Sequence, residues 1–174
     1  MNLLDLMLKR RSVRTYSEET IKEADLKMIL QAGLASPSGR ARRPWEFIVV
    51  QDKEMLAQMA ECRIAGAGML RGAAAAIVVV GDETLTDVWT EDCSIAMTQM
   101  HLMASSLGVG SCWIQGRLRE AEEGLTTEAY LRERLQFPEN LRLEAILSLG
   151  IPEKETVPHT MDELLEEKIH WEKF

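Results

Sequence analysis

Residues 91–107 place the strongest constraint on the fold, because apolar side chains would surround the whole helix that their spacing predicts. The side chains that recur at helical spacing are Ile95, Met97, Met100, His101, Leu102 and Met103. A helix of this kind cannot leave a face in water, so we expect it in the core or in a subunit interface. Gly108 follows it and is typical of a left-handed helix cap. We interpret His101 as a hydrogen-bonded residue of the core or interface rather than as a ligand or base.

The length and composition indicate one globular domain over residues 1–174. The chain is 46% hydrophobic and 28% charged, close to ordinary globular values. The longest apolar run, residues 73–80, is far shorter than the roughly 20 residues that span a bilayer. Residues 1–12 are charged and amphipathic, unlike a secretory signal. We therefore expect a cytoplasmic protein with no membrane partner.

Periodicity and capping signals predict roughly six helices and four strands in an irregular order, which favours an α+β or mixed α/β layered domain. The helices are expected at residues 3–8, 20–35, 52–62, 91–107, 127–136 and 160–169. The strands are expected at residues 47–50, 75–80, 111–114 and 144–149.

Some of these elements carry a more specific expectation. Residues 3–8 are so densely apolar that their helix should be largely buried. Residues 20–23 and 160–163 have the pattern of a capping box, and residues 75–80 read as a strand buried on both faces. The last residues carry Trp171 and Phe174, which a short tail cannot bury by itself. The tail should therefore dock onto its own domain or onto a partner subunit.

Several familiar catalytic and metal-binding motifs are absent from the sequence. It contains no HExxH, GxSxG or GxxxxGK[ST] motif and no carboxylate spacing typical of a calcium loop. Neither GxG sequence opens a strand-to-helix turn with a third glycine, which disfavours a Rossmann phosphate loop. Cys62, Cys93 and Cys112 are odd in number and widely spaced. We expect them to be buried and free, without a disulfide or a metal site.

Basic residues are concentrated at the start of an otherwise acidic chain. The formal net charge is −8, yet residues 1–43 hold nine basic and five acidic residues. An acidic protein is repelled by nucleic acid at long range, so short arginine clusters indicate a local anion site better than a nucleic-acid surface. Residues 10–14, RRSVR, offer guanidinium groups, a hydroxyl and backbone amides, which are donors that suit a phosphate. The alternative is that these arginines are solvated charges at a helix end.

Four segments, in this order, resemble the nitroreductase family of FMN-dependent flavoproteins over nearly the whole chain. They are RRSVRTY at residues 10–16, ASPSGRARRPWEF at residues 35–47, LGVGSCWIQG at residues 107–116, and LGIP at residues 149–152 with the KIHW tail at residues 168–171. The resemblance implies an α+β, nitroreductase-like fold, with a central mixed β-sheet surrounded by helices, in an intertwined homodimer with FMN at the interface.

The resemblance also implies which residues hold FMN. The first segment would grip the phosphate and the ribityl chain, and the second would reach the flavin from the other subunit. The third would lie against the isoalloxazine ring, with the backbone amides of Gln115 and Gly116 directed at its reactive nitrogen. The cofactor-binding residues implied in this way are Arg10, Arg11, Ser12, Arg14, Pro37, Ser38, Gly39, Ala41, Trp113, Ile114, Gln115 and Gly116.

The activity that the resemblance implies is FMN-dependent NAD(P)H oxidoreduction. NADH or NADPH would pass a hydride to the flavin and leave, and a nitroaromatic, a quinone or a similar small acceptor would then take the same place, in ping-pong order. Because the flavin carries this chemistry, no catalytic side chain is expected.

The sequence departs from the family pattern at two places. Ala41 and Arg43 stand where the family has Asn and Gln, and no clear late basic pair follows, although Lys154 or His159 could replace it. Two alternatives therefore stay open. One is a relative that uses FMN for another reaction, such as reductive dehalogenation or dehydrogenation. The other is a flavin-binding protein without turnover.

Overall fold

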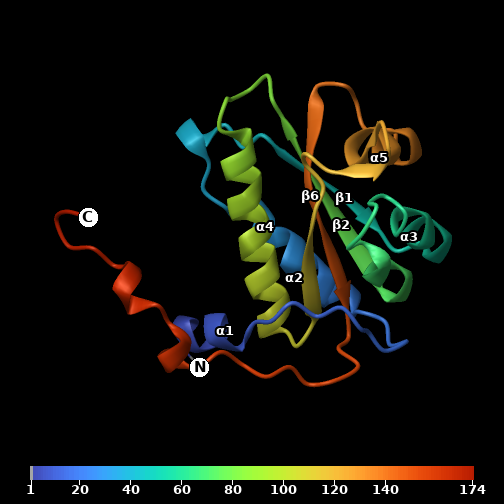
Figure 1. The fold of residues 1–174 in the computed structure, drawn as a ribbon. Coiled ribbons are helices and arrows are strands. Elements are labelled where there is room, and N and C mark those ends of the chain that lie inside the picture. The colour runs from blue at the N-terminus through green and yellow to red at the C-terminus, as the bar shows by residue number, and fades with distance from the viewer. Residues whose placement is uncertain (1) are drawn as a thin grey trace.

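A four-stranded sheet forms the centre of the computed structural model, which describes residues 2–174 (Figure 1). In spatial order its strands are β1 (Trp45–Val50), β2 (Ala75–Asp82), β6 (Leu141–Gly150) and β3 (Gly110–Gln115). All three strand pairings are antiparallel. A parallel bridge joins Ser12 to Ser111 of the edge strand β3, so the mixed character expected of the sheet comes from this bridge.

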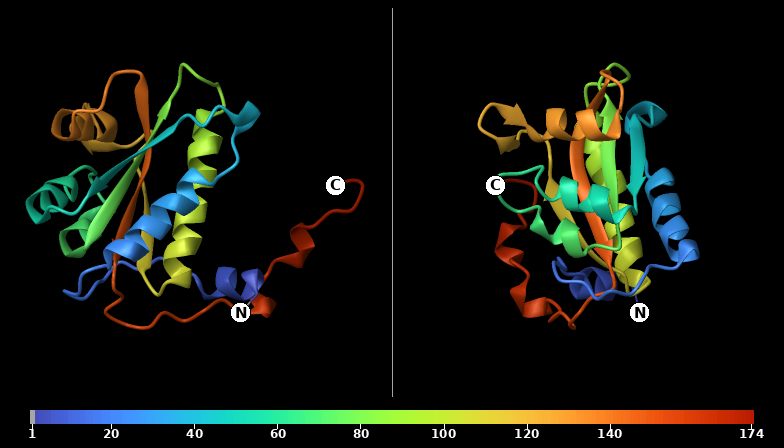
Figure 2. Two further views of the ribbon diagram at one scale, coloured as in Figure 1. Left: turned by 180° about the vertical axis from the view of Figure 1, so that it is seen from behind. Right: turned by 90° about the vertical axis from the view of Figure 1, so that its right-hand side faces the viewer.

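Helices cover both faces of the sheet, as Figure 2 shows. The first face carries α2 (Glu23–Leu34) and α4 (Trp89–Ser106). The second face carries α3 (Lys53–Met59), the 3-10 helix η2 (Gly68–Gly72) and α5 (Thr127–Leu135). A small hairpin of β4 (Glu120–Glu122) and β5 (Leu125–Thr126) precedes α5. The α+β fold class is thereby confirmed.

The two cores meet at β2, whose side chains from Ala75 to Gly81 are buried on both faces, as predicted. The α4 prediction is also confirmed. Met97 and Met100 are fully buried, and Gly33 of α2 approaches so closely that a Cβ there would lie 2.8 Å from the Met100 sulfur. Gly108 ends the helix region with a φ of 76°. The three cysteines are buried and free, also as predicted.

Three local predictions are wrong. The first helix, α1 (Leu3–Lys9), forms with a capping box made by Asn2 and Asp5, but it has no buried residue, and Leu3 is 62% exposed. The capping box expected at residues 20–23 does not form, because α2 begins at Glu23 without a side-chain cap. The helix expected at residues 160–169 is replaced by two single 3-10 turns, η3 (Met161–Glu163) and η4 (Glu166–Lys168).

The last 22 residues, 153–174, are exposed throughout. Residues 153–159 run beside the N-terminal segment, and the chain beyond them leads away from the body of the molecule (Figure 1). Trp171 is 84% exposed and Phe174 fully exposed, so the tail does not dock onto its own domain. It is joined to the N-terminal segment by a backbone bond from His159 to the Leu8 carbonyl at 2.9 Å. Among the described residues, no helix has both the length and the apolar content needed to cross a membrane.

Candidate functional site

Strand β3 is an edge strand, and its backbone has one side that is not paired with β6. In an antiparallel pair, successive residues point their backbone groups alternately toward and away from the partner. The amide of Gly116 donates to the Glu144 carbonyl of β6 at 3.2 Å, so the amides of Gln115 and Trp113 point the other way. The edge of the sheet therefore presents backbone donors along Trp113–Gln115. The amide of Gly116, which the resemblance placed beside that of Gln115, is bonded within the sheet in this chain.

Side chains hold the exposed end of β3 in a fixed conformation. The Trp113 indole donates to the Gln115 side-chain oxygen at 2.9 Å, and the Gln115 side-chain nitrogen lies 3.4 Å from the Glu144 carbonyl. Trp113 is half-buried against the core beside α4, whereas Ile114 is buried in the core on the other face. Trp113 is thus both a core residue and a neighbour of the open edge.

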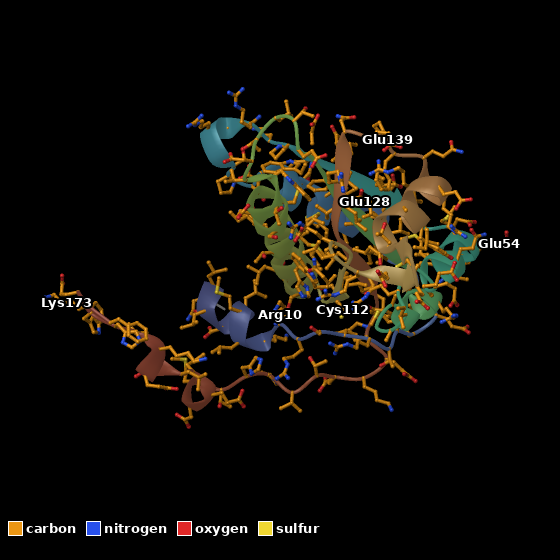
Figure 3. All side chains as sticks on the ribbon, turned by 45° about the horizontal axis from the view of Figure 1, so that its top comes forward. Arg10, Glu54, Cys112, Glu128, Glu139 and Lys173 are labelled. Carbon is orange, nitrogen blue, oxygen red and sulfur yellow. The ribbon has the colours of Figure 1, made fainter. Side chains whose placement is uncertain are left out.

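Three of the predicted residues, Arg10, Ser12 and Arg14, gather near the start of β3, around Cys112. Burial raises the pKa of the Cys112 thiol, while Arg14, a hydrogen bond with Ser12, and Arg10 each lower it in part. Figure 3 labels Arg10 and Cys112 at the same end of the molecule. Within residues 2–174, neither Arg10 nor Arg14 has a carboxylate within 4.0 Å. Arg10, Ser12 and Arg14 therefore form a small cationic cluster at this strand end, which we call the arginine cluster.

Arg10 is held by a buried histidine. Its Nη1 lies 3.1 Å from His101 Nε2, and His101 Nδ1 lies 2.5 Å from the Ser111 hydroxyl. Arginine can only donate, so Nε2 accepts and Nδ1 carries the proton that it donates to Ser111. Burial, and then the charge of Arg10, lowers the pKa of His101 to about 4. The expectation of a hydrogen-bonded, buried His101 is confirmed.

Arg11 does not join this cluster. Its guanidinium donates to the Val157 carbonyl at 2.9 Å. Arg11 also lines a cavity of about 580 Å³, together with Lys9 and Lys154. His159, the other candidate for the late basic position, pairs with Glu163 at 2.5 Å on the exposed tail.

The predicted loop residues Pro37, Ser38, Gly39 and Ala41 surround the 3-10 helix η1 (Gly39–Ala41). The Gly39 amide donates to Asp92 Oδ1 of α4 at 2.8 Å, and the Ser38 hydroxyl accepts from the Arg43 amide at 2.9 Å. The φ angles of Ala41 and Arg43 are 55° and 50°, in the left-handed region. These are the two positions that depart from the family pattern, and both lie where the loop backbone turns in the left-handed conformation.

The loop and the arginine cluster lie at opposite ends of α4 in one chain (Figure 1). Asp92 anchors the loop and His101 anchors Arg10, and these residues are nine positions apart. At a rise of 1.5 Å per residue, the two anchors are separated by roughly 13 Å along the helix. One chain therefore does not bring the two predicted groups together.

Sequence reasoning missed two buried carboxylates that support these elements, Asp92 and Glu144. They are 3% and 4% exposed, and Asp92 Oδ2 and Glu144 Oε2 have no hydrogen-bond partner among residues 2–174. Glu144 Oε1 accepts from the Ser94 hydroxyl at 3.1 Å, and burial raises the pKa of this carboxyl. Both partnerships join residues at least 50 positions apart, so the sequence contains no local signal for them.

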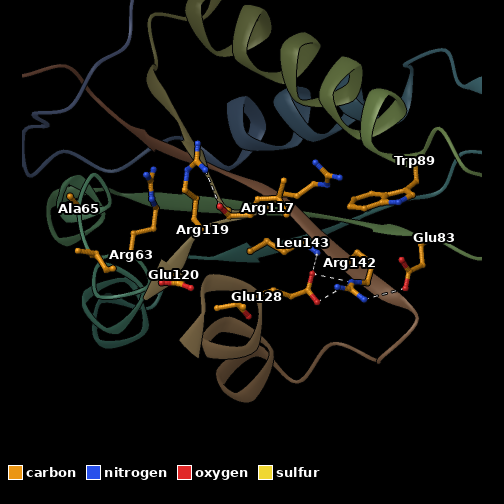
Figure 4. Close-up of a pocket in the computed structure, with 14 residues that line it drawn as sticks. Arg63, Ala65, Glu83, Trp89, Arg117, Arg119, Glu120, Glu128, Arg142 and Leu143 are labelled. Atoms are coloured by element: carbon orange, nitrogen blue, oxygen red, sulfur yellow. Dashed lines mark hydrogen bonds and ion pairs between the residues drawn. The ribbon is translucent and has the colours of Figure 1, made fainter. Parts of the chain in front are cut away.

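A cavity of about 840 Å³ opens directly beyond the end of β3, where Gly116 forms part of its wall (Figure 4). Its charged lining residues come from five segments: Arg63, Glu83, Arg117, Arg119, Glu120, Glu128 and Arg142.

The chain is similar to known proteins over nearly its whole length. A protein of Archaeoglobus fulgidus, provisionally named NADH dehydrogenase/NAD(P)H nitroreductase, is 39% identical, and the match covers 98% of each chain. The structure of an FMN-dependent nitroreductase from Clostridium difficile R20291 superposes with a TM-score of 0.96 at 39% identity, over 98% of this chain and 99% of that one. A nitroreductase with bound FMN from Desulfitobacterium hafniense DCB-2 gives 0.78 at 26% identity, over 98% of each chain.

The family model described as the nitroreductase family matches residues 7–67 and 64–151. These ranges include the arginine cluster, the loop around η1, α4 and the open edge of β3. The resemblance to the nitroreductase family is thereby confirmed, and the chain belongs to that family.

Proposed function

We propose that this protein is an FMN-dependent NAD(P)H oxidoreductase of the nitroreductase type. The observation that carries the proposal is the cationic cluster of Arg10, Ser12 and Arg14, which lies next to an open strand edge with outward-pointing amides. A dianionic phosphate and a flat, hydrogen-bonding ring need these two features side by side. The FMN named for the relatives from C. difficile and D. hafniense supports the assignment.

The donors present fit FMN. Arg10 and Arg14 supply guanidinium forks and Ser12 a hydroxyl for the phosphate, and neither arginine is neutralised by a carboxylate within residues 2–174. The amide of Gln115 is positioned to donate to the ring, while the bond from Trp113 to Gln115 orients the side chain beside it. Arg11 is bonded to the Val157 carbonyl, so it would add to the positive potential at the phosphate without contacting the phosphate itself.

We further propose that the working unit is a homodimer paired about α4. A two-fold arrangement brings the loop of one chain, with Pro37, Ser38, Gly39 and Ala41, to the arginine cluster of the other. Apolar surface left uncovered in one chain supports this: Leu3, Leu34, Trp171 and Phe174 are all more than half exposed. The tail at residues 170–174, which carries Trp171 and Phe174, would then dock onto the partner.

Bound FMN supplies hydride transfer between NADH or NADPH and a small acceptor such as a nitroaromatic or a quinone. The residues of this chain bind and orient the reactants rather than react themselves. Donor and acceptor use the same face of the site in turn, which predicts ping-pong kinetics.

The test is an absorbance spectrum of the purified protein, followed by anaerobic addition of NADH and then NADPH. The proposal expects a bound-flavin spectrum that bleaches and that recovers when a nitroaromatic or quinone is added. A colourless protein that takes up no added FMN contradicts it. A flavin that never bleaches identifies a flavin-binding protein without turnover, and a flavin that bleaches but reduces neither acceptor identifies a relative with another reaction.

A further inference from the structure

We propose that the cavity beyond Gly116 binds an anionic group, a phosphate or a carboxylate, on the molecule that reacts at the flavin. We call it the arginine cavity, after Arg63, Arg117 and Arg119 in its wall (Figure 4). The inference rests on the proposed function for the position of the flavin. It goes further by naming the charge of the reacting molecule and the residues that select it.

The charges in the wall do not cancel. Arg142 is paired with Glu83 and Glu128, and Glu128 also binds Arg132 from outside the cavity. By contrast, no carboxylate of residues 2–174 lies within 4.0 Å of Arg63, Arg117 or Arg119. Once these pairs are set aside, the wall holds three guanidinium groups and one carboxylate, that of Glu120. Arg117 also lies near the buried carboxyl of Glu144, whose pKa its charge lowers in part. In a protein with a net charge of −8, this local excess of positive charge favours an anionic ligand.

Backbone hydrogen bonds fix the positions of the three arginines. The Arg117 amide donates to the Glu144 carbonyl at 2.9 Å, and the Arg119 amide closes a turn onto the Gly116 carbonyl at 3.2 Å. Arg63 lies on a segment that is joined to β4 by a bond from the Ile64 amide to the Glu120 carbonyl at 3.0 Å. Figure 4 shows Arg63 and Arg119 extending in the same direction from these two segments. Arg119 Nη1 donates to the Leu118 carbonyl at 2.9 Å, which leaves its other nitrogens available, and the guanidinium groups of Arg63 and Arg117 have no hydrogen-bond partner within residues 2–174. A fixed backbone with these donors suits a preformed anion site.

The same cavity has apolar walls. Ile64 is 71% and Leu118 is 79% exposed, and the Trp89 ring lies 5.9 Å from the guanidinium carbon of Arg117. Exposed aliphatic and aromatic side chains beside unpaired cations fit a ligand that has both an apolar body and a negative charge. This combination describes an aromatic acid or a dihydronicotinamide with its phosphates.

The position of the cavity connects it to the proposed flavin. Gly116 is part of its wall and directly follows Gln115, whose amide points off the open edge of β3. An anion held by Arg117 or Arg119 is therefore attached to a molecule that reaches the same edge. The anion has two sources, the phosphates of the electron donor or an acid group of the acceptor.

Charged and uncharged substrates of the same reaction separate the two sources. The donors are NADH and the uncharged reduced N-benzylnicotinamide, and the acceptors are p-nitrobenzoate and uncharged nitrobenzene. The variants are Arg119→Gln, Arg117→Gln and Arg63→Gln, and the matched control is Arg134→Gln, which removes the same charge from α5 outside the cavity. Flavin content and circular dichroism establish that each variant is folded and loaded.

A rise in KM of about tenfold for the charged substrate, with the uncharged one unchanged, is the expected result for the loss of one charge-assisted hydrogen bond. If NADH is affected, the anion is the donor's phosphate; if p-nitrobenzoate is affected, it is the acceptor's acid group. Equal changes for charged and uncharged substrates, or none in any cavity variant, overturn the proposal.

A separate titration does not depend on turnover. Inorganic pyrophosphate and benzoate are titrated calorimetrically into the protein as purified, and we expect Arg119→Gln to lose binding that Arg134→Gln keeps. If the wild-type protein oxidises no dihydronicotinamide but still binds these anions through Arg119, the proposed function fails while the anion site stands. If neither anion binds wild type at millimolar concentration, the anion site fails independently of the activity.

Discussion

Arg10 and His101, which are 91 residues apart in the sequence, meet at 3.1 Å, with the histidine buried and neutral on α4. The contact gives the arginine an acceptor that carries no negative charge. Its guanidinium is thereby oriented, while its own charge stays available to an anion.

Replacing His101 should therefore weaken flavin binding through Arg10. We expect His101→Phe to raise the Kd for FMN by roughly threefold to tenfold, because Arg10 loses its acceptor. His101→Gln keeps a side-chain acceptor and should recover part of the loss. FMN fluorescence quenching measures both variants. Equal affinities in wild type and His101→Phe would show that the contact does not position Arg10.

Arg14 belongs to the cluster that we propose contacts the FMN phosphate, whereas Arg11 lies outside that cluster. Arg14→Ala should weaken FMN retention by about tenfold or more and leave the protein folded, because a charge-assisted bond to a dianion is lost. Arg11→Ala removes the same charge next to the cluster, but Arg11 is bound to the Val157 carbonyl, so its effect should stay within about threefold. Flavin occupancy after gel filtration compares the two. An equal loss in both would mean that only net charge matters.

Stability should depend on pH through His101. Its pKa is about 4 in the folded chain, against an ordinary value of 6.5, so the unfolded chain binds a proton at a higher pH than the folded chain does. The contribution is fully present above pH 6.5 and is lost as the pH falls toward 4, by on the order of 3 kcal/mol at most. Glu144 acts in the opposite direction, because burial raises its pKa. Urea unfolding of wild type and His101→Gln at several pH values isolates the histidine, and parallel curves would contradict its role.

The contact between Gly39 and Asp92 predicts a difference between two substitutions. Asp92→Asn keeps the oxygen that accepts from the Gly39 amide and removes a buried negative charge whose Oδ2 has no partner within residues 2–174, so its stability should match or exceed that of wild type. Asp92→Ala leaves the Gly39 amide without its acceptor and should destabilise the protein by about 1–3 kcal/mol. Thermal unfolding checks the order. A more stable alanine variant would show that burying the carboxylate costs more than the loop contact contributes.

The elements that could be predicted are those whose side chains are all apolar, because such an element must be buried on every face. Residues 75–80 and 91–107 are apolar on every face, so burial was the one physical solution for β2 and α4. Leu3 and Leu4 are as apolar, yet α1 is exposed in one chain. A dense run of apolar residues indicates that a helix is buried in the working protein, but it does not show whether the same chain or another chain buries it.

The site was predictable where a continuous segment carries it and unpredictable where the fold assembles it. Arg10, Ser12 and Arg14 lie within five residues, and the pattern of that segment led to them directly. Asp92 and Glu144 depend on partners 53 and 50 residues away, and the arginine cavity combines Arg63 with Arg117 and Arg119. A buried acid in a helix or strand looks like a surface acid until its partner is known.

The separation of Asp92 and His101 along α4 has a consequence for mixtures of variants. If each site takes its arginines from one chain and its loop from the other, a chain that lacks Arg14 and a chain with a damaged loop complement each other. Their heterodimer contains one site with both defects and one site with none. When the chains of an equimolar mixture exchange at random, half of the dimers are heterodimers and each has one intact site of two. About a quarter of the wild-type flavin capacity should therefore reappear on mixing two preparations that separately bind almost none, and dilution that splits the pair should remove it again.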